Sequence, residues 1–182
     1  MRYLKGTNNL SLPFGGEKPI LVGFTNADIT GDVDSRKSTS SYMVKFAERV
    51  VAWQSRLQTC VAFYTIETKF ISTTETYKEL LWMKNFLLEL SFKQNHYVLF
   101  CDNQSVIHIG KNSIFHARSK HIDVRYHLIR DVLDFKLMEL EKIHTGDNDA
   151  DIMEKVLPRK KHEACCSIAS EGLNLVEQGK IC

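Results

Sequence analysis

Four short segments of the chain carry the side chains best suited to metal-ion or acid–base chemistry. They are residues 24–28, 65–70, 101–105 and 150–152, and they contain carboxylate, amide and ammonium groups. Carboxylate oxygens are hard ligands of the kind that magnesium prefers. An aspartate at the beginning of a helix also caps that helix or interacts with its dipole. Taken singly, the segments leave both roles open.

The apolar pattern predicts the elements that position these segments. Residues 65–90 carry apolar side chains three or four positions apart, which predicts an amphipathic helix. The other expected elements are strands at 20–26, 41–46 and 49–53 (the last two a hairpin across Ala47-Glu48), a strand at 97–101, helices at 104–110 and 119–134, a strand at 137–144, and a helix capped by Asp147 or Asn148 that continues towards Pro158. Strands that alternate with helices after an initial meander predict an α/β domain with a mixed sheet.

The composition is that of a globular chain whose positive charge is locally concentrated. The 182 residues are 43% hydrophobic and carry a formal net charge of +2. Basic residues gather between 111 and 130, which is typical of phosphate contacts or of a solvated helix face. Five cysteines without a C-x-x-C pair suit a reducing compartment. No apolar run reaches the length of a membrane span, so we expect an intracellular protein without a membrane partner, in the cytoplasm or the nucleus.

The four segments, in this order and with residues 36–42 and 119–127 between them, resemble the ribonuclease H domain of copia-type retroelement Pol polyproteins. The similarity extends over residues 20–162. Residues 1–19 resemble the connector that follows the reverse transcriptase region in such polyproteins, and residues 163–182 remain as a C-terminal tail. We therefore expect a fragment of a longer Pol protein, whose partner in the intact element is the reverse transcriptase region. The resemblance implies the ribonuclease H fold, an α/β fold with a five-stranded mixed sheet flanked by helices.

The resemblance also implies an activity and a metal site. The family hydrolyses the RNA strand of RNA–DNA hybrids with two magnesium ions, one activating the attacking water and the other stabilising the leaving oxygen. Four acidic residues hold these ions, and their positions fall on Asn26, Lys69, Asp102 and Asp151 of this chain. Asp102 and Asp151 are therefore the expected metal ligands. Asn26 and Lys69 stand where the family has acids.

No neighbouring carboxylate compensates for these two substitutions. Asp28 is a candidate surrogate for Asn26 on the same side of an extended strand, but it lies about 7 Å further along. Glu67 is rotated by about 200° from Lys69 on a helix and points away. An ammonium about 4 Å from a carboxylate attracts it by about 4 kcal/mol at an effective dielectric constant near 20, and it repels an approaching magnesium ion.

We interpret the chain as a catalytically degenerate ribonuclease H-like domain, and two alternatives stay open. The first is an active RNA–DNA hybrid ribonuclease, in which Asp28 replaces the first ligand and Lys69 swings aside. The second is a non-catalytic module that binds a hybrid or another nucleic acid through basic residues. The candidate contacts for that role are Arg118, Lys120 and Arg125.

Overall fold

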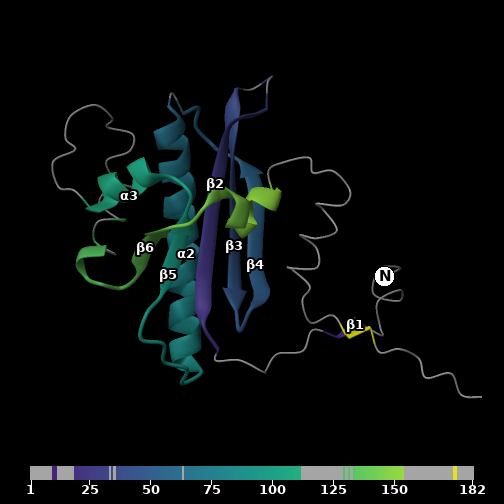
Figure 1. Cartoon of the computed structure of the whole chain (residues 1–182), viewed down its shortest axis with the longest axis vertical. Helices are drawn as coiled ribbons and strands as arrows, with labels where there is room; N and C mark the ends of the chain where they lie inside the picture. The colour runs from purple at the N-terminus through teal and green to yellow at the C-terminus, as the bar shows by residue number, and fades with distance from the viewer. Residues whose placement is uncertain are drawn as a thin grey trace, which may run out of the picture.

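A five-stranded mixed sheet forms the centre of the molecule (Figure 1). The computed structural model describes residues 10–11, 19–32, 34, 36–62, 64–111, 129, 131, 133–153 and 174–175. The strand order is β4-β3-β2-β5-β6. Antiparallel pairs join β2 (Leu21–Asp32), β3 (Lys37–Phe46) and β4 (Arg49–Leu57), whereas β5 (Val98–Cys101) pairs in parallel with β2 and with β6 (Glu139–Lys142). A separate two-stranded ladder pairs β1 (Leu10–Ser11) with β7 (Asn174–Leu175).

Helical segments pack on both faces of the sheet (Figure 1). The long helix α2 (Thr65–Glu89) covers one face together with α3 (Gln104–Lys111), over a core that includes Leu21 and Leu80. Two 3₁₀ helices, η1 (Thr145–Asp147) and η2 (Asp149–Met153), follow β6. Ala150 of η2 packs on Phe24 and Met43. Because alternate residues of β2 face opposite sides, the sheet separates two apolar clusters.

Gly23 sets how closely α2 approaches the sheet. A Cβ atom at this position would lie 2.5 Å from Cδ1 of Leu80 and 3.1 Å from Cδ1 of Leu99, too close for any side chain. About two turns before Leu80 on α2, the interface is polar. The Ser72 hydroxyl donates to the backbone carbonyl of Asn26 over 2.5 Å and lies 2.9 Å from the Thr25 hydroxyl. The amino-terminal half of α2 is thus held to β2 by hydrogen bonds rather than by apolar packing alone.

The predicted hairpin at residues 41–53 is confirmed, and its turn is strained. Phe46 pairs with Arg49, so Ala47 and Glu48 form a two-residue loop. Their φ angles are 50° and 62°, in the left-handed region that a two-residue hairpin of the primed type requires. Asparagine and glycine are the usual residues there, because a Cβ atom is unfavourable at positive φ. The chain adopts this turn with two residues that are poorly suited to it.

The structure confirms the other predicted elements that fall on described residues. The strand at 20–26, the helix at 65–90, the strand at 97–101, the helix at 104–110 and the strand at 137–144 are confirmed as β2, α2, β5, α3 and β6. The helix predicted to begin at Asp147 or Asn148 is confirmed over the described residues as the 3₁₀ helix η2, which η1 precedes. Asn148 caps η2, because its side-chain oxygen accepts from the N–H of Ala150 over 3.2 Å. The Ser41 hydroxyl donates to the Ala150 carbonyl over 3.1 Å. This hydrogen bond ties η2 to β3.

Some predictions fall on residues that the structure does not describe. The continuation of the last helix towards Pro158 lies outside the described residues, and so do the boundaries at residues 162 and 163. Of the helix expected at 119–134, only Ile129, Asp131, Leu133 and Asp134 are described, and all four are helical. The division into a connector, a domain and a tail stays a prediction.

We predict that Glu48→Gly stabilises the protein. A left-handed residue with a Cβ atom costs about 1–2 kcal/mol that glycine largely avoids, so the free energy of unfolding in urea should rise by about 1 kcal/mol. Glu48→Ala is the matched control, because it removes the same carboxylate but keeps the Cβ atom. Equal effects of the two substitutions would contradict the account of this turn.

Candidate functional site

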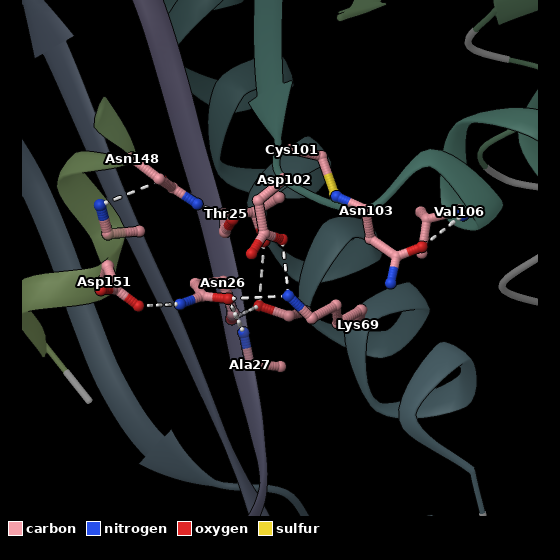
Figure 2. Close-up of polar contacts among 12 residues, drawn as sticks. Thr25, Asn26, Ala27, Lys69, Cys101, Asp102, Asn103, Val106, Asn148 and Asp151 are labelled. Atoms are coloured by element: carbon pink, nitrogen blue, oxygen red, sulfur yellow. Dashed lines mark hydrogen bonds and ion pairs between the residues drawn. The ribbon is translucent and has the colours of Figure 1, made fainter. Parts of the chain in front are cut away.

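The candidate site lies where the parallel pairing of β2 and β5 stops. The last pair is Thr25 with Cys101. Asn26 follows Thr25 in the sequence, and Asp102 follows Cys101. Both side chains therefore leave the sheet at the same level. Figure 2 shows Lys69 of α2 reaching this point, and Asp151 of η2 approaching Asn26 from the opposite side. The structure thus brings together all four positions at which the resemblance places a metal ligand.

The four side chains form a continuous chain of polar contacts (Figure 2). The Lys69 Nζ atom lies 2.6 Å from Oδ1 of Asp102 and donates to Oδ1 of Asn26 over 3.2 Å. The Nδ2 group of Asn26 then donates to Oδ1 of Asp151 over 2.8 Å. The order from one carboxylate to the other is Asp102, Lys69, Asn26, Asp151. An ammonium and an amide therefore bridge two carboxylates.

The amide of Asn26 has one orientation that satisfies both neighbours. A lysine ammonium only donates, and an ionised carboxylate only accepts. The amide must therefore turn its oxygen to Lys69 and its nitrogen to Asp151. The backbone N–H of Ala27 also donates to the Asn26 oxygen, over 2.9 Å, and reinforces this choice. An aspartate at this position would offer no donor to Asp151.

The four side chains are largely buried, so the loss of any of these contacts would be costly. The side chains of Asp102 and Lys69 are 7% and 14% exposed, and the residues Asn26 and Asp151 are 6% and 8% exposed. A charge removed from water in this way is tolerated only when it is paired and hydrogen-bonded. Two carboxylates and one ammonium leave the cluster with a formal charge of −1.

The neighbouring Cys101 adds no further charge to the cluster. Burial raises the pKa of the Cys101 thiol, the backbone N–H of Asn103 opposes this rise, and Asp102 adds to it. The thiol therefore remains protonated at neutral pH. It offers the site neither a thiolate ligand nor a nucleophile.

Hydrogen bonds that the sequence did not reveal hold the site in place. Nδ2 of Asn148 donates to the Thr25 carbonyl over 3.0 Å, while its oxygen accepts from the N–H of Ala150 over 3.2 Å. Together with Ser41 and Ser72, this residue fixes η2 and α2 on the end of β2. Two signals in the sequence point to these bonds: the run of hydroxyl residues within an otherwise amphipathic helix, and Asn148 as a candidate helix cap.

The residues present do not fit a magnesium site. Magnesium requires several oxygen ligands in near-octahedral geometry. Here an ammonium contacts one carboxylate directly, and an N–H group is directed at the other. In the part of the chain that the structure describes, no group of three histidine, cysteine or acidic side chains is placed to hold a metal ion. The expected magnesium ligands Asp102 and Asp151 are engaged by Lys69 and Asn26 instead.

The remaining candidate residues lie elsewhere. Asp28 is exposed and pairs with Thr39 two positions beyond Asn26 on β2. The basic residues Arg118, Lys120 and Arg125 lie outside the described residues. Among the described helices, none is both long and apolar enough to cross a membrane.

Comparisons with known proteins identify relatives of this chain in sequence and in fold. No protein-family model matches the chain. The chain is 51% identical over 165 residues to the retrovirus-related Pol polyprotein from transposon TNT 1-94 of Nicotiana tabacum, which corresponds to 91% of this chain and 12% of that protein. It therefore spans about an eighth of the length of this relative.

Solved structures with the same fold share little sequence with the chain. The N-terminal RNase H domain of rv2228c from Mycobacterium tuberculosis matches with a TM-score of 0.54 and 10% identity, over 85% of this chain and 99% of that one. The foamy viral protease-reverse transcriptase in complex with RNA/DNA hybrid matches with a TM-score of 0.52 and 14% identity, over 79% of this chain and 21% of that one. The chain has the ribonuclease H fold and belongs to the ribonuclease H-like domains of copia-type retrotransposon Pol polyproteins.

Proposed function

We propose that this chain is a ribonuclease H-like domain that does not hydrolyse RNA. The observation that carries the proposal is the distance of 2.6 Å between Nζ of Lys69 and Oδ1 of Asp102. The ammonium lies at the position where the family has an acidic ligand, and it neutralises a carboxylate that the reaction would need for a metal ion. The family's activity is therefore absent from this chain.

The chemistry of phosphodiester hydrolysis explains why this substitution is decisive. Metal-assisted hydrolysis needs cations to activate water and to stabilise the leaving oxygen, and carboxylates to hold those cations. The Lys69 ammonium only donates hydrogen bonds, so it is not a ligand for a cation. Asn26 is a neutral ligand at best, and its oxygen already accepts from Lys69 and from the Ala27 N–H.

The alternative of an active ribonuclease requires a different arrangement. Asp28 would have to replace Asn26, and Lys69 would have to leave Asp102. Asp28 is exposed on β2, two residues beyond the site, whereas the Lys69 side chain is largely buried. Departure of Lys69 would leave Asp102 buried without a cation, which is costly. The observed contacts favour the inactive form.

Nucleic-acid binding without cleavage is the second candidate function. The foamy viral neighbour was solved in complex with an RNA/DNA hybrid, and its fold matches this chain. The basic residues between 111 and 130 are suited to phosphate contacts. We propose that any such binding is weak, because it would depend on phosphate contacts alone. In an intact polyprotein, the reverse transcriptase region is the proposed partner of the domain.

We predict that the unmodified protein does not cleave an RNA–DNA hybrid above background with magnesium or with manganese. The reason is that Asp102 and Asp151 are engaged by Lys69 and Asn26. The measurement is a cleavage assay on a hybrid with a labelled RNA strand. Strong magnesium-dependent cleavage that disappears in Asp102→Asn would show that the site is active after all.

We predict that the metal site can be repaired in two steps. Lys69→Glu changes the local formal charge by two units and should recover metal binding first. Addition of Asn26→Asp should be needed for measurable cleavage, because the first-strand ligand is expected to bridge both ions. Calorimetric titration with magnesium and the same cleavage assay check the two steps. Metal binding by Asn26→Asp alone, equal to that of the double variant, would contradict the role given to Lys69.

We predict that binding to a hybrid, where it is detected, falls steeply as the salt concentration rises, because phosphate contacts release counterions. Charge reversal by Arg118→Glu and Lys120→Glu should weaken binding to hybrids of every sequence alike. Lys78→Glu on α2 is a matched control outside this stretch. Tight binding that is insensitive to salt would exclude the basic stretch as the contact surface.

A further inference from the structure

Asn26 and Lys69 are complementary in hydrogen bonding, because Lys69 provides N–H donors and Asn26 provides an oxygen acceptor. Lys69 offers N–H donors, which the Asn26 oxygen accepts over 3.2 Å. By accepting from Lys69, that oxygen leaves the amide nitrogen directed at Asp151, 2.8 Å away. Neither contact involves a metal ion. The two substituted residues therefore complement each other chemically, as well as departing from the family pattern.

A change at only one of the two positions leaves a mismatch in the cluster. With aspartate at position 26 and Lys69 present, the carboxylate of Asp151 loses the N–H donor that Asn26 provides and meets a second carboxylate. With glutamate at position 69 and Asn26 present, Asp102 loses its cation and meets a like charge. Either mismatch would be buried, where an unpaired charge is most unfavourable. The pair is therefore internally consistent only when both residues are present.

We infer that Asn26 and Lys69 form a metal-independent structural link that joins four elements of the fold. The link runs from the end of β5 at Asp102, through α2 and β2, to η2 at Asp151. Through hydrogen bonds and an ion pair, the link holds two buried carboxylates near each other, as bound cations would otherwise do. This inference deepens the proposed loss of hydrolysis, because it assigns the substituted residues a function of their own.

A second ion pair in the same region provides a control for this inference. The Lys45 Nζ atom lies 2.6 Å from Oδ2 of Asp149, and their side chains are 12% and 18% exposed. This pair also anchors η2 on the sheet, at a similar distance and burial. Lys45 pairs with Val22 on β2, four positions before Asn26, and its Nζ atom lies over the Phe24 ring. It tests whether loss of any largely buried lysine–aspartate pair near the site would have the same effect as loss of the pair formed by Lys69 and Asp102.

The experiment is a double-mutant cycle on the full chain, measured by urea unfolding in the presence of a chelator. Lys69→Met and Asn26→Ala are made singly and together, and Lys45→Met is combined with Asn26→Ala as the control. Loss of either linked residue should lower the folding equilibrium constant roughly 100-fold. The Lys69 and Asn26 effects should be coupled by a factor of roughly ten or more, whereas the Lys45 and Asn26 effects should multiply independently.

The unmodified chain gives a test that depends on no variant. Its thermal unfolding midpoint should be the same with excess chelator and with excess magnesium, because Lys69 and the Asn26 amide already engage the two carboxylates. A midpoint that rises with magnesium would overturn the inference, as would independent effects of Lys69→Met and Asn26→Ala. These readouts are separate from cleavage. A chain that does not cleave but shows an uncoupled cycle disproves only the link, and a chain that cleaves disproves the proposed function.

Discussion

The need to give buried carboxylates hydrogen-bonding partners is the constraint on which the structure around the ends of β2 and β5 depends. Asp102 and Asp151 lie on different elements and are both largely removed from water. In active ribonuclease H domains, bound metal ions balance the charge of such carboxylates. In this chain the Lys69 ammonium contacts one carboxylate and the Asn26 amide contacts the other. We propose that the same architecture supports here an internal polar link in place of a metal centre.

The fold supplies the accuracy that this link requires. Gly23 allows α2 to approach β2 closely, and Ser72 ties the turn that follows Lys69 to the Asn26 carbonyl. On the other face, two hydrogen bonds fix η2. Asn148 donates to the backbone of β2, and Ser41 of β3 donates to the Ala150 carbonyl. A shift of α2 or η2 by one residue would separate the ammonium or the carboxylate from its partner. The polar contacts around the site thus determine its geometry.

Much of the fold, and the membership of the site, could be predicted from the sequence. Short apolar runs predicted most of the strands, and apolar side chains three or four positions apart predicted α2, because a helix that is buried on one face imposes that spacing. The alignment of motifs indicated that Asn26, Lys69, Asp102 and Asp151 belong together. The sequence could not show that Asn26 bridges Lys69 and Asp151, since that depends on side-chain orientation across four elements. The sequence predicted a helix after Asn148, but it did not show that this helix is of the 3₁₀ type or that its Ala150 carbonyl accepts from Ser41 of β3.

A titration of the unmodified protein with manganese, followed by nuclear magnetic resonance, tests the central claim most directly. Manganese is paramagnetic and broadens the amide signals of residues close to where it binds. The Lys69–Asp102 ion pair predicts that the amide signals of Ala27, Asn103 and Asp151 broaden no more than those of exposed residues remote from the site. Selective broadening of these three signals at low manganese concentration would show that a metal ion displaces Lys69, and it would contradict the account.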